Sequence, residues 1–301
     1  MYCQKLPSPL RGGMEQIQTP KHDIRIKFWG TRGSIPTPGK YFIKYGGNTP
    51  CVEIRCGETI LIFDAGSGMR ELGASLIHEF AGSPKEFHIF ISHTHWDHIQ
   101  GFPFFSMAYL PGNTINFYGG NSVSTLEKLI YGQMDKEYFP VSLYELSSKI
   151  KFNTVTDSPF TIGDITVHFT HQIHPSLSLG FRIEYKGKTV VYATDSEISN
   201  DPEIEAVNDR NIGNLFRDAD VLIADCQYTK EQYETKIGWG HSSIDKIVDK
   251  CNTFGVKRLF AFHHDPMRTD EELDIMIDNA SAQAKPPLKI YGAREKTSVL
   301  L

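Results

Sequence analysis

The nine residues 93–101 constrain this chain more than any other stretch of it. They read His-Thr-His-Trp-Asp-His-Ile-Gln-Gly, so three imidazoles and one carboxylate fall within six positions. The preceding run, residues 87–91, is short, β-branched and aromatic, which is typical of a buried strand. Chemistry in α/β sheets commonly gathers where such strands end. Imidazole and carboxylate are normal zinc ligands, so the segment predicts a metal site. Its first two histidines alternate and suit one ion, while Asp97 and His98 suit a second.

Polar residues also follow apolar runs elsewhere in the chain. They are Asp64 after residues 60–63, His174 ahead of Gly180-Phe181-Arg182, Asp195 after residues 189–193, and His263 after residues 258–262. Together with His-x-His-x-Asp-His, this set resembles the metallo-β-lactamase superfamily, and in particular its ribonuclease Z and cyclic phosphodiesterase branch. The resemblance covers nearly everything from Ile24 to the C-terminus.

The resemblance implies a dinuclear centre that holds zinc or manganese. The first ion would take His93, His95 and His174, the second would take Asp97, His98 and His263, and Asp195 would bridge them. Asp64 would orient a ligand imidazole without binding metal itself. Two choices stay open on the residues alone. His171 is the alternative to His174, and His264 is the alternative to His263.

A second informative segment is Trp239-Gly240-His241-Ser242-Ser243-Ile244-Asp245. Ser242, followed three residues later by Asp245, predicts a capped helix start, whose free N–H groups favour anions. His241 is therefore a candidate to hold phosphate or to protonate a leaving alkoxide, with a surface loop histidine as the alternative. The segment also resembles the Gly-His-Ser/Thr element of ribonuclease Z and related phosphodiesterases, in which this histidine assists catalysis. Asp97 and His241 are the expected catalytic residues.

The pattern of strands and helices predicts an α/β (α+β) protein with two sheets packed face to face and helices outside. Expected strands are 24–29, 51–55, 59–63, 86–91, 114–118, 150–154, 164–170, 179–185, 188–193, 220–224, 257–262 and 288–291, and expected helices are 68–80, 123–132, 211–218, 243–254 and 269–284. The resemblance implies a four-layer αβ/βα sandwich with the metals at one edge of the sheets. Residues 1–22 read as a disordered tail and residues 23–301 as one hydrolase domain.

Composition narrows the class of partner. The net charge of −5, from 31 basic and 36 acidic residues, argues against a dedicated nucleic-acid binder. Five cysteines without a Cys-x-x-Cys pair fit a reducing compartment. No apolar run approaches the length of a membrane helix. We therefore expect a soluble, cytoplasmic protein, and the resemblance suggests a homodimer.

Four local features indicate the branch of the superfamily. His174 stands before Pro-Ser-Leu-Ser-Leu-Gly, which resembles the phosphodiesterase branch, whereas thiolesterases and β-lactamases have a Pro-Gly-His-Thr-like setting. Only twenty residues separate His174 from Asp195, which leaves no room there for the tRNA-gripping arm of ribonuclease Z. Residues 224–228 read Ala-Asp-Cys-Gln-Tyr where a Glu-containing motif is expected. The end motif, residues 263–266, reads His-His-Asp-Pro in place of the tRNA enzyme's Ser- and Arg-containing version.

These features favour a metallo-hydrolase that cleaves a small phosphodiester, such as a cyclic nucleotide, with a hydroxide held between two metal ions. The cyclic-phosphate phosphodiesterase of phosphonate breakdown has a further Cys-rich metal site, and no such cluster exists here. Aromatic residues in segment 102–144 suit either base stacking or core and dimer packing. The alternatives are tRNA 3′ processing of the ribonuclease Z type and a non-catalytic binding module of the same fold.

Overall fold

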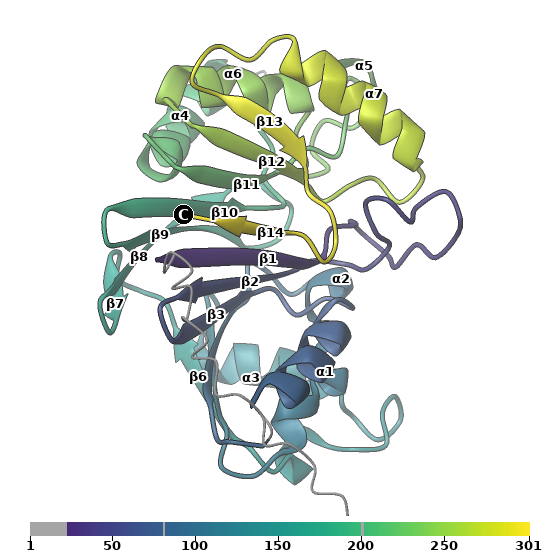
Figure 1. Ribbon diagram of the computed structural model, residues 1–301, viewed down its shortest axis with the longest axis vertical. Helices are drawn as coiled ribbons and strands as arrows, with labels where there is room; N and C mark the ends of the chain where they lie inside the picture. Colours follow the sequence, from purple (N-terminus) through teal and green to yellow (C-terminus); the bar gives the residue numbers. More distant parts are fainter. Residues whose placement is uncertain (1–22, 81, 200–201) are drawn as a thin grey trace, which may run out of the picture.

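The computed structural model describes residues 23–80, 82–199 and 202–301, so the expected tail of residues 1–22 lies outside the described part. Two seven-stranded sheets form the centre of the molecule (Figure 1). The first contains, from edge to edge, β14 (Ser298–Leu300), β1 (Ile24–Gly30), β2 (Cys51–Cys56), β3 (Thr59–Phe63), β4 (Glu86–Phe90), β5 (Thr114–Gly119) and β6 (Lys149–Thr154). The second contains β13 (Lys289–Gly292), β12 (Arg258–Phe262), β11 (Val221–Asp225), β10 (Lys188–Ala193), β9 (Ser178–Tyr185), β8 (Ile165–Gln172) and β7 (Phe160–Ile162).

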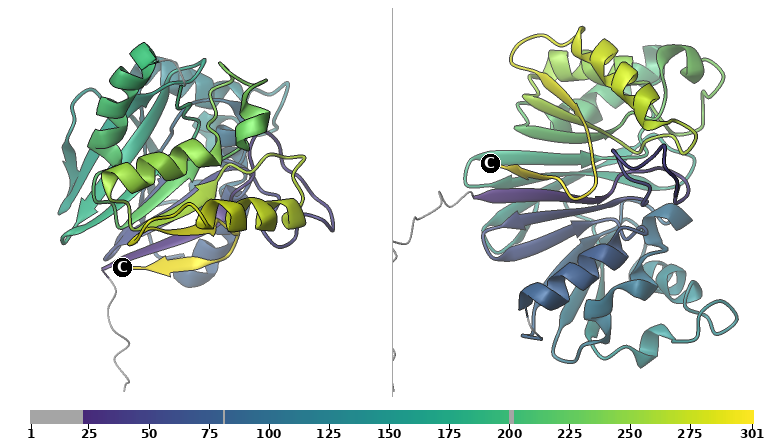
Figure 2. Two further views of the ribbon diagram at one scale, coloured as in Figure 1. Left: turned by 90° about the horizontal axis from the view of Figure 1, so that it is seen from above. Right: turned by 45° about the vertical axis from the view of Figure 1, so that its right-hand side comes forward.

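Helices cover the outer face of each sheet, which gives four layers (Figures 1 and 2). The first sheet carries α1 (Met69–Phe80) and α3 (Val123–Gly132), and the second carries α4 (Pro202–Phe216), α6 (Ile244–Phe254) and α7 (Asp270–Ser281). The short helices α2 (Trp96–Ile99) and α5 (Lys230–Tyr233) lie in connections. In α6 the buried positions 244, 247, 248 and 251 have the helical period, so one apolar stripe faces the sheet. The predicted four-layer αβ/βα sandwich is confirmed.

Three apolar clusters fill the spaces between the layers. One lies between the two sheets and includes the stacked rings of Phe63 and Phe90, whose centroids are 4.8 Å apart. The other two lie between each sheet and its helices. Strand β11 is buried at all five positions because both faces of its sheet are covered, which explains its unbroken apolar sequence before Asp225.

The strand pairing gathers chemistry at one edge of the sandwich. Strands β3 to β6 are parallel to one another, and so are β10 to β13, so their carboxyl ends meet at common edges. Candidate ligands follow β4, β10 and β12 at this edge, and Asp64 follows β3. Among the described residues, no helix combines the length and apolar character needed to cross a bilayer.

Several elements differ from the sequence prediction, and the short helices α2 and α5 were not predicted. Helix α4 begins at Pro202, nine residues before the predicted start at residue 211. Proline is favoured at the first position of a helix, and Asp201-Pro202-Glu203 carried that signal. Strands β7 and β14 were not predicted. Each has three residues, too few for a periodic pattern, and β14 exists because it pairs with β1 at the other end of the chain.

Candidate metal centre

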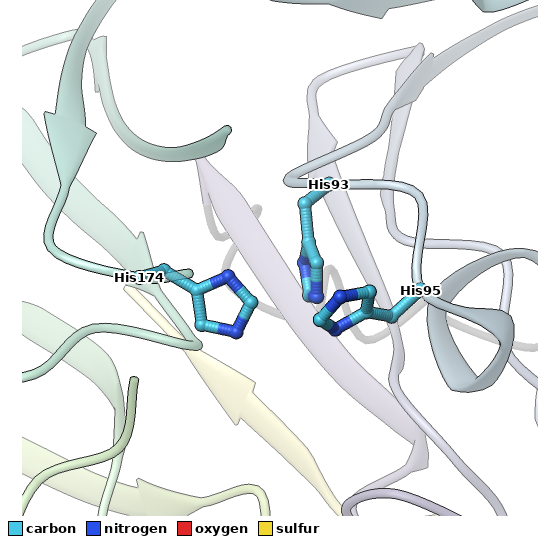
Figure 3. Close-up of side chains that lie close together, drawn as sticks. All are labelled: His93, His95 and His174. Atoms are coloured by element: carbon cyan, nitrogen blue, oxygen red, sulfur yellow. The ribbon is translucent and has the colours of Figure 1, made fainter. Parts of the chain in front are cut away.

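Three histidines from two distant segments meet in the first of two ligand groups. His93 and His95 come from the connection between β4 and α2, and His174 comes from the connection between β8 and β9. Their ring centroids are 4.5 to 4.9 Å apart, and Figure 3 shows the three rings converging. One nitrogen from each lies within 4.8 Å of the other two, the spacing at which one ion can bind all three. His171, the alternative to His174, is exposed on β8.

The second group contains Asp97, His98 and His263. Asp97 Oδ2 lies 3.1 Å from Nε2 of His98 and 3.2 Å from Nε2 of His263. The same oxygen accepts a hydrogen bond from the backbone N–H of Ser34 at 2.8 Å, a contact that sequence reasoning missed. His264 is the alternative to His263. Its Nε2 lies 2.9 Å from the carbonyl oxygen of Ala293, away from the group.

Asp195 lies between the two groups and presents one carboxylate oxygen to each. Oδ1 is 3.6 Å from Nε2 of His93 and 3.8 Å from Nε2 of His174. Oδ2 is 3.2 Å from Nε2 of His98 and 3.3 Å from Nε2 of His263. Burial alone would raise the pKa of Asp195, but the charges of His263 and His98 hold it well below its ordinary value. An ionised carboxylate in this position can bridge two ions.

The side chains fit divalent ions. Nε2 of His93 is buried and has no hydrogen-bond partner among the residues that the structure describes, although an unsatisfied buried polar atom costs roughly 1–3 kcal/mol. Nε2 of His98 is also buried and faces the carboxylates of Asp97 and Asp195. Burial, with the charges of neighbouring histidines, lowers the pKa of His93 well below its ordinary value, so the ring is neutral and keeps a lone pair for a metal. Burial likewise lowers the pKa of His95 and of His174. Imidazole nitrogens and carboxylates that converge in this way form a donor set for zinc or manganese.

Asp64 supports the second group from behind. Its Oδ2 lies 2.8 Å from Nδ1 of His98, so that Nε2 of the same ring faces the group. The carboxylate also accepts hydrogen bonds from the Ser92 backbone N–H, the Ser92 hydroxyl and the Tyr192 hydroxyl, at 2.7 to 2.8 Å. Asp64 is thus fixed by three donors in the position that an orienting role requires.

His241 stands at the edge of the centre and pairs with a carboxylate that sequence reasoning did not single out. Its Nδ1 lies 2.6 Å from Oδ2 of Asp225, and its ring stacks on that of His263 with centroids 5.0 Å apart. Burial alone would lower the pKa of His241, but the charge and hydrogen bond of Asp225, with the charges of Asp195 and Asp97, raise it to about 9. The signal for Asp225 was present in the sequence, since it ends a buried strand.

The predicted cap at Ser242 is wrong, although the helix start is near the expected place. Helix α6 begins at Ile244, its N-cap is Ser243, and no side chain caps it. The Ser242 hydroxyl instead donates to the carbonyl oxygen of Ser196 and accepts from the backbone N–H of Ile198. These longer-range bonds tie the His241 segment to the residues that follow Asp195, and tertiary contact thereby overrides the local capping pattern.

Backbone strain marks three of the site residues. Asp64, Asp195 and His263 each follow a strand and have φ of 58°, 49° and 56°, a left-handed conformation that costs roughly 1–2 kcal/mol for a residue with a side chain. Each turn directs its side chain across the edge of the sheet. Close packing accompanies this strain, because a Cβ at Gly33 would lie 2.4 Å from Nδ1 of His263.

Comparison with known proteins defines the class. A family model described as a β-lactamase superfamily domain matches residues 59–264, more than half of the chain. The chain belongs to this metallo-β-lactamase superfamily, and it is a hydrolase of that superfamily. Among curated relatives, "Ribonuclease Z" of Thermoplasma volcanium is 24% identical over 303 residues, which cover 87% of this chain and 93% of the relative.

Solved structures support the fold. The metallo-β-lactamase fold protein YhfI from Bacillus subtilis has a TM-score of 0.67 at 19% identity, with 92% of this chain and 98% of that one covered. A "New Diphosphatase from the PhnP Family" has a TM-score of 0.63 at 16% identity, with the same coverage of 92% and 98%. At these identities the likeness establishes the architecture, and the substrate has to be argued from the site.

Proposed function

We propose that this protein is a metal-dependent phosphodiesterase that hydrolyses a small phosphodiester, such as a cyclic nucleotide. The observation that carries the proposal is the combination of two ligand groups joined through Asp195 with the His241–Asp225 pair at their edge. In the proposed assignment, His93, His95 and His174 would hold one ion, Asp97, His98 and His263 would hold the other, and Asp195 would bind both. Bound ions would activate water and offset charge on the phosphoryl oxygens.

The residues of the chain have separate tasks in this proposal. Asp97 and Asp195 supply negative charge to a pair of dications, while Asp64 keeps His98 oriented. His241 holds a proton: with Nδ1 engaged by Asp225, Nε2 is the nitrogen left to protonate a departing alkoxide. The raised pKa of His241 keeps it protonated at neutral pH, as a general acid requires.

Substrate size is argued from the segment between His174 and Asp195. Strands β9 and β10 and the turn between them fill it, so this position has no arm to grip a tRNA. The net charge of −5 likewise disfavours a large polyanion. Ribonuclease Z-type RNA cleavage remains the second candidate, because curated relatives over most of the chain have that name.

The proposal extends to the ions and the working form of the protein. We propose zinc, with manganese as the alternative, because histidine and carboxylate donors suit both. The four cysteines in the described part of the chain are free and buried, which supports a cytoplasmic location, and a homodimer is the proposed assembly.

The test compares substrates under identical conditions. Protein loaded with zinc or with manganese is assayed against 2′,3′- and 3′,5′-cyclic nucleotides, bis(p-nitrophenyl) phosphate, short RNA and a pre-tRNA. We expect kcat/KM for a cyclic nucleotide to exceed that for pre-tRNA. Efficient cleavage of pre-tRNA at one position would favour the ribonuclease reading, and absence of hydrolysis with every substrate would leave a binding module.

A further inference from the structure

Two of the three tryptophans of the chain are exposed, and both adjoin the first ligand group. Trp96 is 80% exposed and Trp239 is 56% exposed, whereas Trp29 is 5% exposed and buried in a core cluster. Trp96 directly follows His95 at the start of α2. Trp239 precedes Gly240, whose Cα packs so closely on His174 that a Cβ there would lie 2.1 Å from Cδ2 of the ring.

The two tryptophans thus neighbour, along the chain, residues on different sides of the three-histidine group. In Figure 3, His95 and His174 approach His93 from opposite directions. Trp96 is the sequence neighbour of His95, and Trp239 is the sequence neighbour of Gly240, which packs on His174. They also come from different halves of the sandwich. An exposed indole presents a large flat face that a planar ligand can cover.

The backbone around Trp239 is anchored although this residue lies between two glycines. The buried carboxylate of Glu197 accepts hydrogen bonds from the backbone N–H of Gly238 at 2.9 Å and of Gly240 at 2.8 Å. Both glycines have positive φ, 84° and 87°, so the segment adopts a turn that residues with side chains rarely make. Glu197 is two residues after Asp195, so the backbone on both sides of Trp239 is tied to the segment that follows Asp195.

The surroundings of the two rings favour a flat ligand. The ammonium of Lys236 lies over the Trp239 ring, 3.8 Å from its centroid. The ammonium thus occupies one face of the indole, and the other face is left for stacking. Trp96 makes no side-chain hydrogen bond, ring contact or cation–π contact with any residue that the structure describes. A rigid aromatic surface with a neighbouring cation, next to a site for phosphate, suits a nucleobase attached to that phosphate.

We propose that Trp239 on one side and Trp96 on the other form a base-binding site for a nucleotide substrate. This inference rests on the proposed phosphodiesterase function and adds that the substrate carries an aromatic base. Base–aromatic stacking changes affinity by roughly 10- to 100-fold, so the loss of one ring is measurable. The contribution is to binding the base, and Glu197 acts as a positioning residue for the Trp239 ring.

The test measures binding without turnover. Isothermal titration calorimetry of the ion-loaded protein compares AMP with ribose 5-phosphate, which has the same phosphate but no base. We expect AMP to bind roughly 10- to 100-fold more tightly. Trp239→Ala and Trp96→Ala should reduce this preference, and Trp239→Phe should retain most of it because stacking is preserved. The matched control is Tyr144→Ala, which removes a 72% exposed ring that packs near Tyr131 of α3.

The outcomes separate this inference from the proposed function. Equal binding of AMP and ribose 5-phosphate, or AMP affinities in both Trp→Ala variants that equal those of the Tyr144→Ala control, would overturn the base site even if phosphodiesters are hydrolysed. A preference for AMP that depends on Trp239 or Trp96, in a protein that hydrolyses no phosphodiester, would support the base site and reject the proposed function.

Discussion

Replacing Asp225 with Asn tests the role of the His241–Asp225 pair. Asp225 is fully buried, and its Oδ2 lies 2.6 Å from Nδ1 of His241, whose pKa is raised to about 9. Asn keeps the shape but removes the charge, while the burial that lowers the pKa of His241 remains. The pKa should then fall to its ordinary value of about 6.5 or lower.

The direction of the pH effect follows from the protonation state in which His241 is active. A general acid works in its protonated form, so activity is present below the pKa and is lost as pH rises through it. At pH 8, a pKa of 9 leaves about nine tenths of the histidine protonated, and a pKa of 6.5 leaves about one thirtieth. Asp225→Asn should therefore slow hydrolysis at pH 8 by roughly 30-fold and move the alkaline limb down by about 2.5 pH units. Bound dications would lower the pKa of His241 in both proteins, so the separation between the two alkaline limbs is the quantity to compare.

The assay is kcat as a function of pH from 6 to 10, with a cyclic nucleotide and with bis(p-nitrophenyl) phosphate. The cyclic nucleotide releases a basic alkoxide that needs a proton, whereas nitrophenolate is a stable anion. With the cyclic nucleotide, Asp225→Asn should shift the alkaline limb of the pH profile to lower pH. With bis(p-nitrophenyl) phosphate, the effect of the substitution should be small. Asp225→Glu, which keeps the charge, is the matched control, and ion content is measured in every variant because Asp225 lies near His263. An unshifted limb in Asp225→Asn with full ion content would refute the proton-donor role of His241.

Three further predictions concern the centre itself. Asp97→Ala and His263→Ala should each lower the ion content from about two toward one per chain, because both residues serve the second ion; metal analysis that finds full occupancy in both would reject that assignment. His241→Ala should slow cyclic nucleotide hydrolysis by roughly 10²–10⁴ and affect bis(p-nitrophenyl) phosphate much less; equal losses would indicate that this residue grips phosphate. Gly240→Ala should weaken metal affinity about 10- to 100-fold, because the new Cβ would displace the ring of His174; unchanged affinity in a metal titration would contradict the observed packing.

The parts of the fold that the sequence predicts well are those with strong local patterns. Strands such as β3 and β11 are unbroken apolar runs, and α6 has an apolar stripe, so each is visible within a short window. Strand β14 was missed because its pairing with β1 joins residues at opposite ends of the chain. No local pattern encodes such a contact.

The candidate site divides in the same way. The His-x-His-x-Asp-His segment is local, and the other expected ligands each follow a recognisable strand, so the sequence could nominate all of them. The choice between His263 and His264 depends on which of the two side chains is directed into the centre after β12 ends. The backbone φ of 56° at His263 sets that direction. Asp225 was noted only as a departure from a motif, because its contact with His241 spans two segments that no periodicity connects.

The most direct test of this account is a crystal structure of the ion-loaded protein with anomalous diffraction recorded at the zinc or manganese edge. We predict two anomalous peaks per chain, one among His93, His95 and His174 and the other among Asp97, His98 and His263, with Asp195 in contact with both. A single peak, or peaks away from these residues, would contradict the dinuclear centre on which the proposed function depends.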